Sequence, residues 1–322
     1  MGRWLLRRVF QALLTVAAAA TLLFFLMRIA PGDPLVRLDD RPLTAAQTAA
    51  LRARYGLDQP PLRQFATFLS AAARGDLGTS IAHGRPVATL IAERLPATLI
   101  LGGTVLLLNF TLGLWLGVRQ ALRNGRAADR WLGIASLTAY SVPSFWLALL
   151  LVWLVAVRWR LLPAAGMHDP LLPVAARTGA RLLDLLAHLA LPALTLSLVS
   201  IAATMRYQRV AMLEALALPC VLTARAKGIS DRRVVWGHAW RNALFPVITL
   251  FGLWLPVLVT GSVFVEAVFA WPGLGLLAAD AVGSRDYPVL MGATLLVSTV
   301  IVAGGLAADV AYAVVDPRVR HR

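Results

Sequence analysis

Lys227 is the only lysine in this 322-residue chain, whose 30 other basic residues are arginines. It lies in the stretch "ARAKGIS" (224–230) and could be a catalytic ammonium, a phosphate-binding group or a leftover of composition. A phosphate-binding P-loop requires G-x-x-x-x-G-K-[ST]. Lys227 follows Ala226 and precedes Gly228, so the chain has no P-loop. Any ATP hydrolysis linked to this protein must therefore take place on another polypeptide.

The other reactive side chains form no catalytic or metal-binding pattern. "GLGLLA" (273–278) has the spacing of a dinucleotide fingerprint, but it follows Ala-Trp-Pro instead of a strand. "GTSIA" (78–82) departs from the G-x-S-x-G elbow at its last position. The single cysteine, Cys220, excludes an internal disulfide. No metal-ligand spacing relates the five histidines: His83, His168, His188, His238 and His321. We expect no catalytic residue, no cofactor and no metal.

The composition indicates a membrane protein. Of the residues, 59% are hydrophobic and only 15% are charged, whereas about a quarter are charged in a soluble domain. Six stretches without Asp, Glu, Lys or Arg approach or exceed the ~20 residues that span a bilayer. They are 9–27, 99–118, 131–157, 185–205, 242–265 and 287–308. The sequence therefore predicts an all-α polytopic membrane protein with six transmembrane helices, and a soluble protein with buried core helices is disfavoured.

The net charge of +15 gives an orientation. With the N-terminus in the cytoplasm, the inner segments hold 17 of the 31 basic residues but only 4 of the 16 acidic ones. Basic residues are retained in cytoplasmic loops, so both termini are predicted to be cytoplasmic. The basic excess then reports topology, and no nucleic-acid partner is expected.

Four parts follow along the chain. Residues 1–30 are predicted to be an uncleaved signal anchor, because the apolar run exceeds a signal-peptide core. Residues 31–95 should form an extracytoplasmic segment of three short helices, the first opened by a Thr44–Gln47 capping box and the third closed before Pro96. Residues 96–312 hold the remaining spans and a cytoplasmic loop at 206–243. Residues 313–322 form a cytoplasmic tail.

The cytoplasmic loop is predicted to contain an ordered helix–turn–helix. Pro219 suits the first position of a short helix, Gly228 its end, and Ser230 the cap of the next helix. Such a helix parallel to the membrane could serve as a rigid lever. A positively charged loop that only anchors to lipid headgroups remains an alternative.

Inside the predicted spans the polar side chains are mainly hydroxyls, and none belongs to Asp, Glu, Lys or Arg. Charged groups near the spans are limited to Glu266 and Asp309, at span ends, which favours a passive conduit driven from outside this chain. Gly113 and Gly117 form a GxxxG pair that lets another helix approach closely. Candidate residues lining a translocation pathway are the hydroxyl-bearing Ser141, Ser144, Ser197, Ser200, Thr260 and Ser262.

Ten ordered stretches across nearly the whole chain resemble a known family. They are "RIAPGDP" (28–34), "YGLDQPP" (55–61), "RGDLGTSI" (74–81), "GRPVATLIAERLPATL" (84–99), "SVPSFWLALLL" (141–151), "TARAKGIS" (223–230), "RNALFPVIT" (241–249), "VFAWPGLG" (268–275), "RDYPVLMG" (285–292) and "DPR" (316–318). The chain resembles the inner-membrane permease subunits of binding-protein-dependent ABC importers of the dipeptide, oligopeptide and nickel type.

The resemblance implies a type I ABC importer transmembrane fold in the bacterial plasma (inner) membrane. It implies a heterodimer with a second permease, two cytoplasmic ATPases and an extracytoplasmic solute-binding protein. It also implies an ATPase-coupling helix at Leu222, Thr223, Ala224, Arg225, Ala226, Lys227 and Gly228. The general importer signature there begins Glu-Ala-Ala, and Leu222-Thr223-Ala224 departs from it as the peptide branch commonly does.

The substrate and two other classes of function remain open. Peptide is favoured, because the uncharged spans offer no metal-binding cluster, while nickel complexes, glutathione and sugars pass through relatives with similar signatures. A stand-alone channel or secondary transporter is the alternative reading, and a membrane-embedded enzyme is a third.

Overall fold

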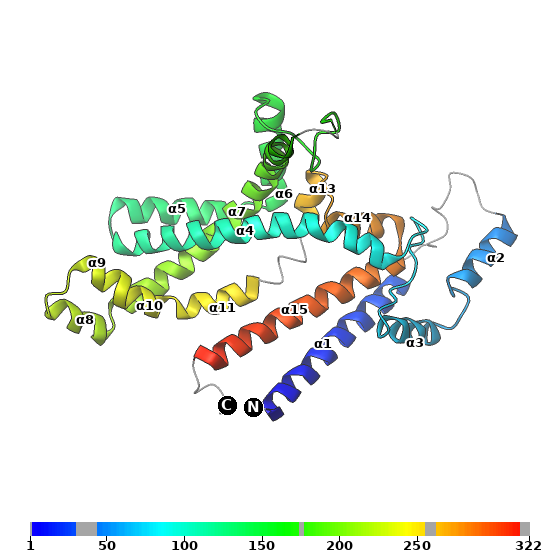
Figure 1. Cartoon of the computed structure of the whole chain (residues 1–322), viewed down its shortest axis with the longest axis horizontal. Coiled ribbons are helices and arrows are strands. Elements are labelled where there is room, and N and C mark those ends of the chain that lie inside the picture. The colour runs from blue at the N-terminus through cyan, green and yellow to red at the C-terminus, as the bar shows by residue number, and fades with distance from the viewer. Residues whose placement is uncertain (1, 30–43, 174–176, 255–261, 316–322) are drawn as a thin grey trace.

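The computed structural model describes residues 2–29, 44–173, 177–254 and 262–315 (Figure 1). In these residues the chain is helical and forms no strand; Thr79 and Pro86 make an isolated bridge. The predicted all-α fold is confirmed for this part of the chain.

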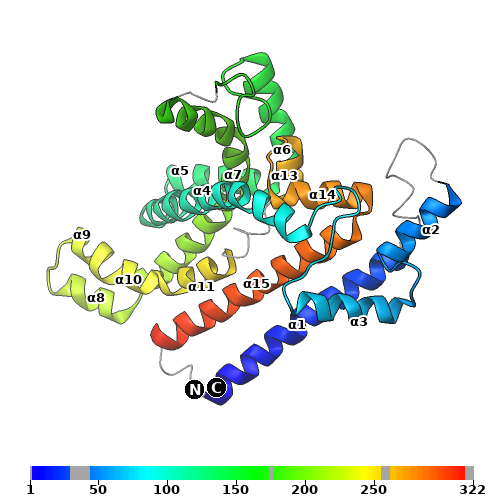
Figure 2. The same ribbon diagram turned by 45° about the vertical axis from the view of Figure 1, so that its right-hand side comes forward.

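Four helices are long and apolar enough to cross a membrane. They match the first, second, fourth and sixth predicted spans and are α1 (Gly2–Ile29), α4 (Val87–Leu122), α7 (Thr178–Leu216) and α15 (Tyr287–Val315). α1 and α15 run side by side (Figures 1 and 2). Together these helices form the frame on which the shorter elements are placed.

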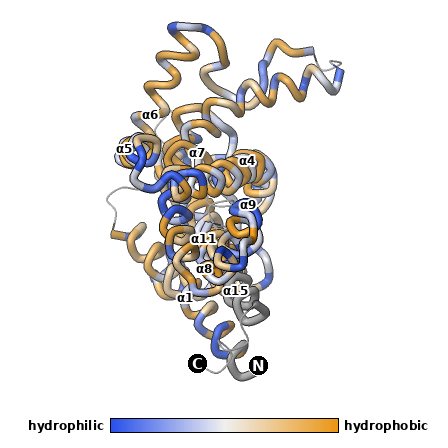
Figure 3. Tube along the Cα trace, turned by 90° about the vertical axis from the view of Figure 1, so that its left-hand side faces the viewer, coloured by the Kyte–Doolittle hydropathy of each residue, from blue (hydrophilic) through white to orange (hydrophobic). Residues whose placement is uncertain are grey.

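Large apolar side chains remain uncovered on this frame and on the shorter helices. Leu13, Leu14 and Leu22 of α1 are between 60% and 65% exposed, and Trp153 is 58% exposed. Apolar surface of this extent is rare on soluble monomers and suits contact with lipid or a partner subunit. Apolar residues run along α4 and α7, while hydrophilic residues gather near α8 (Pro219–Ala226) and α9 (Asp231–Arg233) (Figure 3).

The third predicted span is not one straight helix. α5 (Ala127–Ser141) is followed by α6 (Ser144–Leu151) and the π-helical η1 (Val152–Arg158), and the two halves are bent by 97°. The break is at Val142, whose φ of −79° and ψ of 126° are extended. Because Pro143 follows, the helical conformation of Val142 is disfavoured sterically. The single helix expected at 131–157 is therefore corrected to a bent pair.

The fifth predicted span, at 242–265, is described only at its two ends. α10 (Trp240–Ala243) leads into α11 (Phe245–Trp254), and the chain resumes at α13 (Val263–Val268). Residues 255–261 lie outside the described residues, and so does the candidate pathway residue Thr260. The span as a whole stays a prediction.

The α4–α7 contact is the most extensive packing between two helices of the structure. A Cβ atom on Gly117 would lie 2.6 Å from both the Cβ of Gln208 and the carbonyl oxygen of Met205. A Cβ atom on Gly113 would lie 3.0 Å from Thr204. Only glycine permits this approach at Gly117, so the predicted role of the GxxxG pair is confirmed.

The segment before α4 contains two of the three predicted short helices. α2 (Ala45–Arg54) begins with the expected capping box. The backbone N–H of Gln47 donates to Thr44 Oγ1 at 3.3 Å, and the backbone N–H of Thr44 donates to Gln47 Oε1 at 2.9 Å. α3 (Pro61–Ala72) packs Phe65 and Phe68 against Phe24 of α1. The predicted third helix is wrong, because α4 begins at Val87 and continues through Pro96.

Candidate functional site

α8 is the short helix that the sequence predicted in the loop at 206–243. It begins at Pro219, whose missing N–H is not needed in a first turn. It ends before Gly228, whose φ of 75° suits glycine. The last turn is closed by Lys227 N–H donating to the Thr223 carbonyl at 3.0 Å and Gly228 N–H donating to the Arg225 carbonyl at 2.9 Å.

α8 has one buried and one exposed face. Val221 is fully buried and Ala224 is 5% exposed, whereas Leu222 is 52% exposed. The other predicted coupling residues, Thr223, Arg225, Ala226, Lys227 and Gly228, are exposed as well. The structure therefore brings the seven predicted residues together on one helix and its end, and Ala224 alone among them points inward.

The buried face of α8 packs into a cluster that reaches the membrane helices. Val221 and Ala224 share this cluster with Val118 of α4 and Met212 of α7. The π-helical turn η2 (Val234–Ala239) closes it from the other side. Close-packed interiors transmit displacement, because few voids absorb it. A force on the exposed face of α8 would thus be passed to α4 and α7.

The turn after α8 differs from the prediction in one detail. Ser230 is at the N-cap position of α9, but its side chain makes no capping hydrogen bond. Its carbonyl oxygen accepts from Arg233 N–H at 2.9 Å and from Val234 N–H at 3.0 Å. The backbone therefore closes this helix start without the predicted Ser230 side-chain cap. Asp231 instead faces Arg225 at 3.9 Å across the turn.

An ion pair missed by the sequence reasoning joins α5 to α7. Arg209 Nε donates to Asp129 Oδ1 at 2.8 Å, and Arg209 Nη2 donates to Asp129 Oδ2 at 2.9 Å. The N–H of Gly125 donates to the same carboxylate at 2.9 Å. The forked geometry fixes the α4–α5 turn against α7. Asp129 is the only acid in the basic connection at 119–130, and this was the signal available in the sequence.

Three of the candidate pathway hydroxyls line one cavity. Ser144, Ser200 and Ser262 come from three different elements and surround a space of about 170 Å³ together with Trp254. Ser141 lies elsewhere, and its exposed hydroxyl donates to the Leu137 carbonyl at 2.8 Å.

Ser197 is also outside that cavity. It is buried, and its hydroxyl has no hydrogen-bond partner among the residues that the structure describes. Of the five candidate hydroxyls in the described residues, three are therefore brought together.

Glu266 joins α13 to the start of α14. It is fully buried, and its Oε2 accepts from Leu276 N–H at 3.0 Å. A Cβ atom on Gly275 would lie 2.9 Å from the same oxygen, and one on Gly273 would overlap it. The glycines of "GLGLLA" thus allow a carboxylate to reach the start of α14 (Leu274–Ser284), and no strand precedes them.

A second buried acid, Asp286, ties the start of α15 to residues 80–82. It accepts from Ile81 N–H at 3.2 Å and Ala82 N–H at 3.0 Å, and from the hydroxyl of Ser80. Val289 N–H donates to it at 3.3 Å. These bonds leave Ser80 in a structural role and not as an exposed nucleophile.

No group of three or more potential metal ligands occurs among the residues that the structure describes. His188, for example, is buried and its Nδ1 lies 2.9 Å from the Asp184 carbonyl within α7. The apolar helices and α8 together define a polytopic membrane protein with an ordered, two-faced helix at one end.

The chain belongs to the family of binding-protein-dependent transport system inner membrane components. The model of that family matches residues 109–321, and the model of its N-terminal part matches residues 1–102. Further components of a transport system therefore work with this chain, which is a transport component and not an enzyme.

Curated relatives match over their full length. The chain is 37% identical to the oligopeptide transport system permease protein AppB of Bacillus subtilis over 100% of both chains. It is 40% identical to a putative peptide permease protein of Brucella ovis over 99% of both chains. It is 36% identical to the dipeptide transport system permease protein DppB of Escherichia coli over 100% of both chains.

Proposed function

We propose that this chain is the permease subunit of an ATP-driven importer for peptides. It would form the translocation pathway with a second permease and work with two cytoplasmic ATPases and an extracytoplasmic solute-binding protein. The peptide substrate is supported by the names of the relatives, which describe oligopeptide and dipeptide permeases. Separate ATPases are supported by the lack of a P-loop in the sequence.

The proposed placement has six transmembrane helices in the bacterial plasma membrane and both termini in the cytoplasm. Residues 1–30 form the anchor, 31–95 the extracytoplasmic segment, 96–312 the type I core with its loop at 206–243, and 313–322 the tail. The concentration of basic residues in the inner segments supports this orientation. It puts α8 on the cytoplasmic side and α3 outside.

The observation that carries the proposal is the two-faced packing of α8. Its exposed Leu222, Arg225 and Lys227 are available to an ATPase surface, and its buried Val221 joins the cluster of α4 and α7. Movement of the ATPases on binding and hydrolysing ATP would displace α8, and the packed cluster would carry that displacement to the membrane helices. This is alternating access driven from outside the chain.

The proposed pathway wall includes the serine-lined cavity. Ser144, Ser200 and Ser262 offer hydroxyl groups that exchange hydrogen bonds with a peptide backbone without holding it by charge. Ser141, Ser197 and Thr260 remain candidates for the same wall in other states of the complex. Weak, uncharged contacts suit a passage through which a substrate must leave as readily as it enters.

Reconstitution tests the function. Proteoliposomes containing both permeases and both ATPases are supplied with the solute-binding protein and a radiolabelled dipeptide or oligopeptide. We expect uptake that requires both ATP inside and the binding protein outside. Uptake by this chain alone, without ATPases, would instead establish a channel or secondary transporter.

A further inference from the structure

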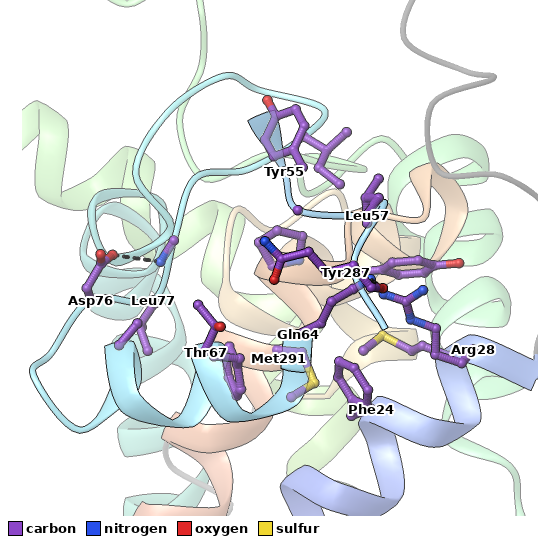
Figure 4. A pocket seen from close by; sticks show the side chains of 18 of the residues that line it. Phe24, Arg28, Tyr55, Leu57, Gln64, Thr67, Asp76, Leu77, Tyr287 and Met291 are labelled. Carbon is purple, nitrogen blue, oxygen red and sulfur yellow. Dashed lines mark hydrogen bonds between the residues drawn. The ribbon is translucent and has the colours of Figure 1, made fainter. Parts of the chain in front are cut away.

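A pocket of about 410 Å³ lies at the end of the molecule away from α8. It is lined by the end of α1, the α2–α3 segment, the loop at 76–81 and the start of α15 (Figure 4). Its volume falls within the ~300–1,000 Å³ range of small-molecule sites. None of the interactions that define the coupling helix or the serine-lined cavity involves its walls.

The walls of this pocket are held in place from two sides. The Asp286 hydrogen bonds fix Ile81 beside the start of α15, where Tyr287 and Pro288 line the pocket. On the other side, the rings of Phe24 and Phe65 are 5.1 Å apart and join α1 to α3. A site with walls tied by buried contacts is pre-formed and needs little ordering when a ligand binds.

Two opposite charges lie at the two ends of this pocket. Arg28 is half-buried, and its guanidinium is 5.5 Å from the centre of the Phe24 ring. Within the part of the chain that the structure describes, no carboxylate pairs with it. Asp76 accepts from Gly78 N–H with Oδ1 at 2.9 Å, which leaves Oδ2 available. Figure 4 shows Arg28 and Asp76 far apart, with Gln64 and Thr67 drawn between them.

The middle of the pocket is mainly apolar. Met27, Phe68 and Met291 come from the three different walls and offer flexible or aromatic surface. Methionine adapts to side chains of varied shape, which suits a site that accepts many sequences. Gln64 donates from its Nε2 to the Gln59 carbonyl at 2.7 Å, which leaves its amide oxygen as an acceptor.

We propose that this pocket binds a short peptide with free termini, its carboxylate at Arg28 and its ammonium at Asp76. The apolar middle would hold the side chains. The separation of the two charges favours an extended zwitterion over a phosphatidylethanolamine headgroup, in which phosphate and ammonium are adjacent. The proposal rests on the proposed function and adds a second, outer peptide site to it.

The test compares free and blocked peptides on the same protein. The permease–ATPase complex is placed in phosphatidylcholine nanodiscs without ATP or binding protein and titrated calorimetrically with Ala-Leu-Ala. Acetylation of the amino terminus or amidation of the carboxyl terminus should each weaken binding by about ten- to a hundredfold, since each removes a charge-assisted hydrogen bond. Equal binding of the free and blocked peptides would overturn the proposal.

Variants locate the site. Arg28→Gln should abolish the effect of amidation, and Asp76→Asn the effect of acetylation. The matched controls are Arg63→Gln and Asp58→Asn, which change exposed charges in or beside α3 outside the pocket lining. If the control variants weaken terminus-dependent binding as much as the pocket variants do, that result would also overturn the proposal.

Two further outcomes separate this proposal from the importer function. Normal ATP-driven uptake without terminus-dependent binding refutes the pocket and leaves the importer standing, whereas binding without uptake retains the pocket and removes the importer. Phosphatidylethanolamine that co-purifies with the complex and is lost in Arg28→Gln would make this a lipid site, against the peptide proposal.

Discussion

The carboxylate of Asp286 accepts a hydrogen bond from the hydroxyl of Ser80, 206 residues earlier in the chain. Asp286 and Ser80 are both fully buried. This contact joins the segment before α4 to the start of α15. It thereby fixes the end of the molecule that the proposed function assigns to the outside.

Asp286→Asn is expected to destabilise the protein by about 1–3 kcal/mol, because an amide nitrogen would face N–H donors that now bond a carboxylate. Thermal unfolding of the purified complex measures this. Asp58→Asn, at an exposed position of the same segment, should leave the midpoint in place. An unchanged midpoint in Asp286→Asn would show that the contact does not hold the fold.

Close approach of α4 and α7 at Gly117 gives a second prediction. Gly117→Ala would place a methyl group 2.6 Å from Gln208 and the Met205 carbonyl, and overpacking of this kind costs about 1–3 kcal/mol. The control is Gly179→Ala in α7, where open space surrounds the glycine. This change should be neutral or slightly stabilising. Thermal unfolding of both variants compares them, and similar midpoints would contradict the packing account.

A third prediction concerns Asp129 and Arg209. Asp129→Asn and Arg209→Gln should each lower the free energy of unfolding. The loss in the double variant should be smaller than the sum of the two single losses by about 0.5–3 kcal/mol, because the two residues act as a pair. A double-mutant cycle from denaturation midpoints measures this coupling. Strict additivity would mean that the two residues stabilise the fold independently.

Neighbouring residues of α8 provide a fourth prediction. Val221→Ala opens a void in a packed cluster and should cost about 2 kcal/mol, whereas Leu222→Ala, on the exposed face, should stay within about 0.5 kcal/mol of the wild type. Unfolding of the complex in detergent distinguishes them. The reverse order would invert the assignment of the two faces.

The sequence predicted the features that depend on local chemistry. The Thr44–Gln47 capping box, the start of α8 at Pro219 and its end at Gly228 each involve residues within a few positions of one another. Hydrophobic length located four apolar helices in the same way. Such signals are complete within a short window of sequence.

Two prolines show where local chemistry was not enough. The chain bends sharply at Pro143, yet α4 continues through Pro96. Next to Pro96, the Ala97 carbonyl accepts from Trp271 Nε1 at 2.9 Å, and Thr98 Oγ1 accepts from Leu274 N–H at 2.7 Å. These contacts with distant residues hold the helix directly after the proline. A sequence read in short windows contains no information about them.

The missed anchors have the same origin. Asp129 with Arg209 and Asp286 with Ser80 join elements whose proximity only the fold establishes, and Glu266 meets the start of α14 through a turn whose shape the sequence did not reveal. The candidate pathway serines were chosen by type, and the fold gathered Ser144, Ser200 and Ser262 around one cavity. Residue type therefore gave useful candidates, and packing decided which of them meet.

The central claim is that α8 transmits ATPase movement to the membrane helices, and the ratio of peptide imported to ATP hydrolysed tests it most directly. In proteoliposomes containing the complete importer, Arg225→Glu combined with Lys227→Glu should lower this ratio by about tenfold or more, because both exposed charges would face the ATPase with the wrong sign. Arg130→Glu, an exposed charge reversal on α5, should keep the wild-type ratio. A wild-type ratio in the α8 double variant would contradict the account.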